Sequence, residues 1–265
     1  MSQGNSEAPK LLHEIEDSPD GEKVRIWGLG GAGFVIRSAG DIAYIDPWLV
    51  PPDSTRTTHR SGGIPFPAEN VRRARAVLST HEHEDHCNVA TILALNKFAG
   101  ARFMGPKSSV AKALSGGLLP TETTTISPGQ EIDLTPSLKV RAFESQDPYE
   151  PQAVMIMVET PRGNILHSGD TSYFDGFKKI GEEFEIDVAL LNFGKQIPTP
   201  EKPYYMNAEK ISAAARDLKA KILVPMHWNL WVETREDPRP IEGVLKKYSP
   251  VSRLEIVDVG ERLDL

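Results

Sequence analysis

The sequence predicts one α/β domain. Short apolar runs of strand length alternate with amphipathic helical stretches, and more than one strand is followed by a helix and a further strand. Three apolar runs end in clusters of histidine and carboxylate side chains. No internal repeat, low-complexity tract or clear linker divides the chain. We therefore expect a single domain over residues 23–265, preceded by a flexible, polar N-terminal arm over residues 1–22.

The first part of the domain is predicted to contain strands only. Residues 23–27, 33–37 and 42–46 are short apolar runs, and Gly40 favours a tight hairpin between the last two. A loop with five prolines follows over residues 47–70. Loops of this length inside a compact domain are usually functional.

The rest of the chain is predicted to alternate strands with helices. Residues 76–79 form a short buried strand, and a helix follows with Asn88 as its N-cap. Further strands are expected at residues 140–143, 153–158, 165–166, 186–191 and 222–224. A second helix is expected over residues 208–218, with Asn207 as its N-cap.

The composition is that of an ordinary folded protein. Among 265 residues, 30 are basic and 37 acidic, which gives a net charge of −7. This balance argues against nucleic acid as a partner, because phosphate backbones select basic surfaces. No apolar run is long enough to span a membrane, and residues 1–10 lack the apolar region of a secretory signal. The single cysteine, Cys87, cannot form an internal disulfide, so we expect a cytoplasmic protein. We expect its partner to be a small-molecule substrate, and a homo-oligomer stays an open alternative.

A glycine motif follows the first strand. Gly28, Gly30 and Gly33 match the G-x-G-x-x-G pattern of dinucleotide-binding proteins. That fingerprint needs a helix directly after it, because the pyrophosphate binds at the helix N-terminus. A strand is predicted here instead, so we expect the glycines to let two strands pass closely.

The most specific pattern comes directly after the strand at 76–79. Within six positions the chain places three histidines and three carboxylates, among them His81, His83, Asp85 and His86. Imidazole and carboxylate are ligands of zinc, manganese and iron. A polar surface loop is the alternative, but this density of ligand-type residues at a strand end favours a metal site. Cys87 is interpreted as a small packing residue.

Two later strand ends carry similar residues. Asp170 follows the strand at 165–166, and His227 follows the strand at 222–224. Alone, Asp170 would be interpreted as a turn residue and His227 as a core residue beside Trp228 and Trp231. Three such strand ends in one domain indicate that their side chains converge.

Together these motifs resemble the metallo-β-lactamase superfamily. Its features recur in register: the glycine-rich segment at 27–34, Asp46-Pro-Trp48, the cluster at 81–86, His167-Ser-Gly-Asp170, the run at 187–191 and Val224-Pro-Met-His227. Within the superfamily they resemble the L-ascorbate-6-phosphate lactonase branch, with Asp237-Pro-Arg239 in support. The resemblance spans about residues 23–240 and implies a four-layer αββα sandwich with metals at one edge.

The resemblance also implies a ligand set for one or two divalent ions, manganese or zinc. His81 and His83 would hold one ion, Asp85, His86 and His227 the second, with Asp170 bridging them. Asp46 would support the metal loop without binding metal. Many superfamily members have a further histidine between the first cluster and the Ser-Gly-Asp turn, and none lies there in this chain. Asp147 occupies about that place, and an oxygen ligand there would favour manganese; a single-metal site stays open.

The expected reaction is hydrolysis of a lactone or ester, including one on a phosphorylated sugar acid. A metal-bound hydroxide, oriented by Asp85 and Asp170 as catalytic residues, would attack the carbonyl. The candidate substrate-binding residues are Trp48, His59, Arg60 and Tyr173, and further cationic or aromatic candidates are Arg56, Tyr149 and Lys195. A phosphodiesterase of the same fold and a non-catalytic binding protein are the alternatives.

Overall fold

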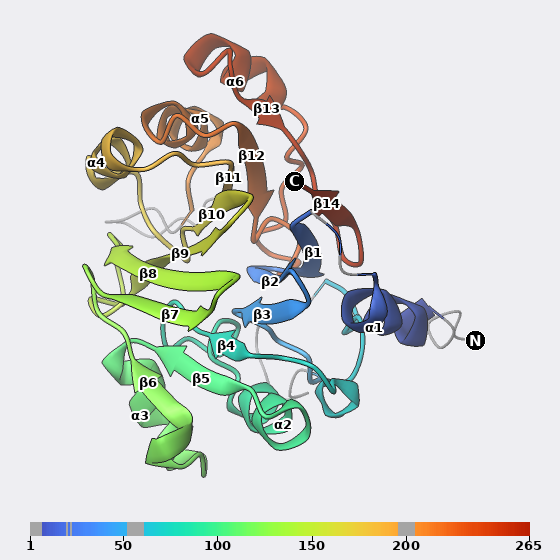
Figure 1. Cartoon of the computed structure of the whole chain (residues 1–265). Coiled ribbons are helices and arrows are strands. Elements are labelled where there is room, and N and C mark those ends of the chain that lie inside the picture. The colour runs from blue at the N-terminus through green and yellow to red at the C-terminus, as the bar shows by residue number, and fades with distance from the viewer. Residues whose placement is uncertain (1–6, 20, 22, 52–60, 196–204) are drawn as a thin grey trace.

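A computed structural model describes residues 7–19, 21, 23–51, 61–195 and 205–265 and arranges them in four layers (Figure 1). Two seven-stranded sheets form the inner layers. In spatial order, the first sheet consists of β14 (Arg262–Asp264), β1 (Arg25–Gly30), β2 (Gly33–Ser38), β3 (Asp41–Ile45), β4 (Ala76–Leu78), β5 (Arg102–Gly105) and β6 (Thr123–Thr125). The second consists of β13 (Arg253–Leu254), β12 (Ile222–Met226), β11 (Val188–Asn192), β10 (Gly163–His167), β9 (Val154–Thr160), β8 (Leu138–Glu144) and β7 (Glu131–Thr135).

Helices cover the outer face of each sheet. The first sheet carries α1 (Glu7–Asp17), α2 (Val89–Ala99) and α3 (Lys107–Ser115), and the second carries α4 (Gly176–Glu183), α5 (Ala208–Asp217) and α6 (Ile241–Tyr248). The predicted N-caps are confirmed: the side chain of Asn88 accepts a hydrogen bond from the Thr91 amide, and that of Asn207 accepts one from the Lys210 amide. None of the helices in the described ranges is long and apolar enough to cross a membrane.

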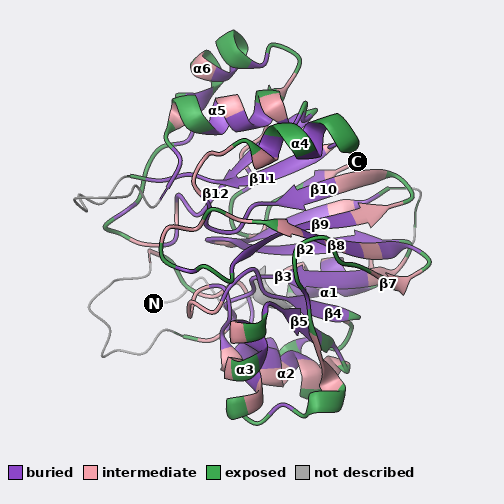
Figure 2. Ribbon diagram, turned by 90° about the vertical axis from the view of Figure 1, so that its left-hand side faces the viewer, coloured by how far each residue is buried: buried purple, intermediate pink, exposed green. Residues whose placement is uncertain are grey.

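Three apolar cores hold the layers together. Along β2, Phe34 and Ile36 face the core between the sheets, while Val35 faces the core beneath α1, α2 and α3. This alternation follows from the two-residue period of a strand. A third core joins the second sheet to α4, α5 and α6. Buried positions therefore concentrate on the strands, and exposed ones on the outer sides of the helices (Figure 2). The predicted αββα sandwich is confirmed.

The strand directions bring the predicted site residues to one edge. β3, β4 and β5 run parallel in the first sheet, as do β10, β11 and β12 in the second. At the carboxyl ends of these strands the sheets are joined by backbone contacts: the Val154 amide donates to the Thr80 carbonyl at 2.9 Å, and the His227 amide to the Gly31 carbonyl at 2.9 Å. The segments after β3, β4, β10 and β12 therefore meet.

The N-terminal segment differs from the prediction of a flexible arm. Leu12 and Ile15 of α1 are buried in the core of the first sheet, and the Arg37 guanidinium donates to the Ile15 carbonyl at 2.7 Å. The Glu16 carboxylate accepts the Arg72 amide at 2.6 Å. The prediction is therefore wrong for residues 7–17, whose apolar residues at helical spacing form a packed face. Residues 1–6, 20 and 22 lie outside the described residues.

Ile15→Ala tests whether α1 is part of the folded domain. Ile15 is fully buried, so its truncation should lower the free energy of unfolding by about 2–5 kcal/mol. Chemical denaturation measures this change. Lys10→Ala on the exposed side of the same helix is the control and should change stability by less than about 0.5 kcal/mol. Equal stability of both variants would support a loosely attached arm.

Candidate metal centre

The loop after β4 is a compact turn that leads into α2. The amides of His86 and Cys87 both donate to the His83 carbonyl, at 3.0 and 2.7 Å, and Asn88 then caps α2. The turn points His81, His83, Asp85 and His86 toward the edge where the two sheets meet. The ring of His81 is fully buried, and that of His86 almost so.

The first group of converging ligands is His81, His83 and Asp147, whose ligand atoms all lie within 4.8 Å of one another. His81 Nε2 is 3.0 Å from His83 Nδ1 and 4.0 Å from Asp147 Oδ2. The Asp147 Oδ1 atom accepts the amides of Tyr149 and Glu150, at 2.8 and 3.0 Å. These bonds turn Oδ2 toward the histidines, where it is buried and has no hydrogen-bond partner among the described residues.

The second group is Asp85, His86 and His227. The Nε2 atoms of His86 and His227 are 3.1 Å apart, and Asp85 Oδ2 lies 3.2 Å from His227 Nε2 and 3.8 Å from His86 Nε2. His227 comes from the end of β12, so a residue more than 140 positions away in the sequence completes the group.

Asp170 lies between the two groups. Its Oδ2 atom is 3.4 Å from His86 Nε2 and 3.7 Å from His227 Nε2, and it forms a third group with His81 and His86. Its Oδ1 atom is buried, and no group in the described part of the chain forms a hydrogen bond with it. The structure thus brings together all seven residues predicted as metal ligands.

Asp46 lies beneath the cluster at the end of β3. Its Oδ1 atom accepts the Thr80 amide at 2.8 Å, and its Oδ2 atom accepts the Thr80 hydroxyl at 2.6 Å. Oδ2 also lies 2.7 Å from Nδ1 of His86. A carboxylate on Nδ1 fixes the ring orientation and leaves the Nε2 lone pair for a metal.

Two residues of the site adopt left-handed backbone conformations, which are strained for residues other than glycine. The φ angle is 46° at Asp46 and 71° at His227. The bond from the His227 amide to Gly31 helps to hold the second of these. A Cβ atom on Gly31 would lie 2.9 Å from Leu230, and one on Gly28 would lie 2.7 Å from the Asp258 carbonyl oxygen. The sequence predicted a close approach of two strands at the glycine motif; at Gly28 the segment that approaches is the one before β14, which forms an isolated bridge through Val259.

The charges at this edge favour a cation. Burial raises the pKa of Asp170, but the imidazoles of His227 and His86 lower it by more, so the net shift is downward. Burial lowers the pKa of His86, but Asp170 and Asp85 raise it well above the usual histidine value. Burial raises the pKa of Asp147. The raised pKa of His86 therefore indicates that the surrounding carboxylates favour positive charge in this buried space, whether it is a proton or a metal cation.

The residues present fit a metal centre. Imidazole nitrogens and carboxylate oxygens are the ligands of zinc and manganese. Two ligands at about 2.0–2.2 Å from one tetrahedral ion lie roughly 3.4 Å apart. His81 lies 3.0 and 4.0 Å from its two partners, and the ligand atoms of the second group are 3.1–3.8 Å apart. Asp147 Oδ2 lies 4.0 Å from His81 Nε2 and has no hydrogen-bond partner among the described residues, so a cation held by this group would satisfy it.

The predicted substrate-binding residues have different outcomes. Trp48 lies near the site, since its ring packs on Trp231, which contacts Asp85. Tyr173 is committed elsewhere, because its hydroxyl donates to Asp217 on α5 at 2.5 Å and its ring stacks on Phe177. Its assignment to substrate is therefore corrected. Tyr149 and Lys195 are exposed. Arg56, His59 and Arg60 lie outside the described residues.

Sequence reasoning missed Trp231. Its indole nitrogen donates to Asp85 Oδ2 at 3.2 Å. The sequence signal for Trp231 was its position, four residues after His227. Trp228, which directly follows His227, gives the same signal, but its ring packs among the outer helices.

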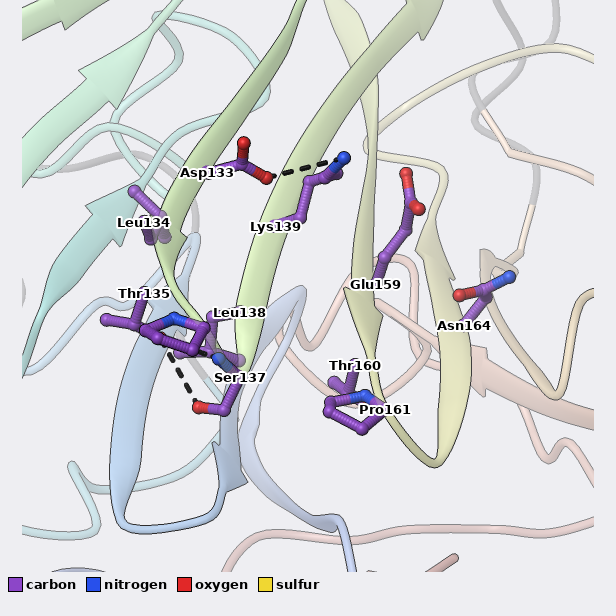
Figure 3. Close-up of a pocket in the computed structure, with 11 residues that line it drawn as sticks. Asp133, Leu134, Thr135, Ser137, Leu138, Lys139, Glu159, Thr160, Pro161 and Asn164 are labelled. Carbon is purple, nitrogen blue, oxygen red and sulfur yellow. Dashed lines mark hydrogen bonds and ion pairs between the residues drawn. The ribbon is translucent and has the colours of Figure 1, made fainter.

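A separate cavity of about 550 Å³ lies at the other end of the second sheet (Figure 3). It is formed by the β7–β8 and β9–β10 turns, and Lys139 on its wall pairs with Asp133 at 3.3 Å. β10 begins here and ends at the metal cluster, so the strand separates the two regions. The cavity carries no histidine and is unrelated to the cluster.

Comparison with known proteins agrees with this geometry. A family model described as a β-lactamase superfamily domain matches residues 43–228. A UPF0173 metal-dependent hydrolase from Pyrobaculum arsenaticum is 28% identical over 232 residues, which cover 86% of this chain and 92% of that relative. A Salmonella heidelberg protein, named a probable L-ascorbate-6-phosphate lactonase, is 28% identical over 196 residues, covering 64% of this chain and 53% of that relative.

A solved structure has the same fold. Igni18, a metallo hydrolase from Ignicoccus hospitalis, aligns with a TM-score of 0.73 and 22% identity over 92% of this chain and 98% of its own. The segment matched by the family model begins in β3 and ends one residue after His227, so it contains the whole ligand cluster. The chain therefore belongs to the β-lactamase superfamily, and its two facing sheets between helix layers are the metallo-β-lactamase fold.

Proposed function

We propose that this protein is a metal-dependent hydrolase that opens a lactone or ester bond in a small molecule. The proposal rests on a third ligand group, formed by His81, His86 and Asp170. It shares His81 with the first group and His86 with the second, so the two groups are joined. A relative of 28% identity over most of both chains is named a metal-dependent hydrolase, which supports the reaction class.

The ligand groups suggest a role for each residue. We assign His81, His83 and Asp147 to one divalent ion, Asp85, His86 and His227 to a second, and Asp170 to a position shared by both. When bound, such ions lower the pKa of a water molecule and polarise the oxygen of the bond to be cleaved. The oxygen ligand from Asp147 favours manganese over zinc.

The chain's own groups would position the reactants. Asp170 is placed to orient the attacking water where the two ligand groups meet, because it forms a ligand group with His81 of the first and His86 of the second. Asp85 is partly exposed, so it is the carboxylate best placed to pass a proton to the leaving group. Trp48 and Trp231 form an aromatic wall beside it.

We propose a lactone as the substrate because the Salmonella relative is named a probable L-ascorbate-6-phosphate lactonase. In this chain, Arg60 and His59 are the residues we propose for the phosphate. If they bind it, Arg60→Ala should raise KM for phosphorylated substrates and leave KM for neutral lactones unchanged.

Metal analysis followed by a substrate comparison tests the proposal. Protein purified without chelator should contain one to two equivalents of manganese, zinc or iron by plasma mass spectrometry, and Asp85→Ala should contain less. The metal-loaded protein should hydrolyse an activated lactone, and activity should disappear after chelation and return with the metal. Hydrolysis of bis-p-nitrophenyl phosphate without lactone opening would favour a phosphodiesterase. Absence of metal uptake would favour a binding protein without catalysis.

A further inference from the structure

Trp231 contacts both Asp85, a candidate metal ligand, and a second tryptophan, Trp48. Its Nε1–H donates to Asp85 Oδ2 at 3.2 Å, and the same oxygen lies 3.2 Å from His227 Nε2. The oxygen that faces the histidines is therefore also the oxygen held by the indole. A carboxylate oxygen has two lone pairs, so it can accept the indole N–H and still bind a cation.

The indole is itself held in place. Its ring packs on Trp48 with centroids 5.5 Å apart and planes inclined by 51°. Trp48 is buried and lies two residues after Asp46, and the amide of its neighbour Leu49 donates to the Thr91 hydroxyl of α2 at 3.0 Å. The Trp231 ring therefore rests on a wall that is anchored to the first sheet and to α2.

We propose that Trp231 is a positioning residue for Asp85 and so controls metal affinity at only one of the two ligand groups. The proposal rests on the proposed function. Asp85 keeps some solvent exposure, and without a donor on its outer side its carboxylate could rotate away from the cluster. The indole N–H has no acceptor capacity and does not titrate, so it holds one orientation of the carboxylate at any pH in the ordinary range.

The effect should be confined to the group of Asp85, His86 and His227. The group of His81, His83 and Asp147 has its own support, since the Tyr149 and Glu150 amides orient Asp147. Within the described part of the chain, Trp231 forms no hydrogen bond or ring contact with these residues. Loss of the indole N–H should therefore weaken the binding of one ion and leave the binding of the other unchanged.

The experiment is a Co²⁺ titration of chelator-stripped protein, followed by visible absorption and equilibrium dialysis. Trp231→Phe keeps an aromatic ring against Trp48 and removes the N–H. Wild-type protein should take up two equivalents. The variant should bind one with unchanged affinity and the other about 10–100-fold more weakly, the usual cost of losing a partner of a ligand. The absorption bands of the second ion should also change.

Trp228→Phe is the matched control, because that indole lies in the outer helix core on the same segment, and it should leave both affinities unchanged. A double-mutant cycle with Asp85→Ala separates positioning from general packing. If Trp231 acts through Asp85, Trp231→Phe should have no further effect in the Asp85→Ala background. Three results would each overturn the proposal: additive losses of Co²⁺ affinity in the double variant, equally weakened binding of both ions, or unchanged binding in Trp231→Phe. No Co²⁺ uptake by the wild type would reject the proposed function itself.

Discussion

Asp170→Ala is expected to lower kcat/KM for an activated lactone by more than about 100-fold at saturating metal. Replacing a residue that only supports a metal ligand costs about 10–100-fold. Asp170 Oδ2 lies 3.4 and 3.7 Å from the Nε2 atoms of His86 and His227, and Asp170 also forms a ligand group with His81, which belongs to the other group. Its second oxygen is buried and has no hydrogen-bond partner among the described residues. Its removal should therefore cost more, because the metal position shared by both groups and the orientation of the attacking water are lost together. Steady-state kinetics at fixed metal concentration measures the change.

The control for Asp170→Ala is Asp217→Ala. Asp217 is also a largely buried carboxylate, but it accepts from Tyr173 at the end of α5 and makes no recorded contact with the cluster in the described residues. Its loss should affect stability and leave kcat/KM within a few-fold of wild type. A loss of less than tenfold in Asp170→Ala would contradict the role given to this residue.

The ligand positions could be predicted because they follow strands in the sequence. His81, Asp170 and His227 each come within a few residues of a buried strand, and parallel strands place their carboxyl ends at one edge. The hydrophobic periodicity also predicted most strands and helices along the chain, whereas the two-sheet sandwich was implied by the family resemblance. Asp147 was harder to predict, since it lies in a turn three residues beyond β8 and only the absence of a further histidine drew attention to it.

Other features depend on contacts that no local pattern encodes. Trp231 and Trp228 have the same residue type in the same segment, and only the folded chain shows which of them reaches Asp85. Tyr173 lies three residues after Asp170, yet its hydroxyl is committed to Asp217. The helix at the N-terminus was missed because Pro9 in its first turn, Pro19 beyond its end and its polar composition outweighed a short apolar face. Tertiary packing thus decided each of these positions.

Asp46→Asn is expected to weaken metal binding by at least about 10–100-fold although it hardly changes the shape of the side chain. The Asn oxygen can still accept the Thr80 amide, as Oδ1 does now at 2.8 Å. The NH₂ group would then replace Oδ2, which at present lies 2.7 Å from His86 Nδ1. An NH₂ group donates to Nδ1, which moves the imidazole proton to Nε2. Because Nε2 is the atom that faces Asp170 and His227, His86 would lose its free lone pair for the metal.

Metal titration combined with ¹⁵N NMR of the imidazoles tests this reasoning, because the two neutral tautomers have different nitrogen shifts. Asp187→Asn is the matched control. It alters a partly buried carboxylate that accepts the Asn164 amide at 2.9 Å and pairs with Lys221 at 2.7 Å, just before β11 begins and away from the cluster. It should leave metal affinity unchanged. If Asp46→Asn binds metal as tightly as the wild type, then Asp46 serves only to hold the Thr80 turn, and the tautomer of His86 is set by the metal ion itself.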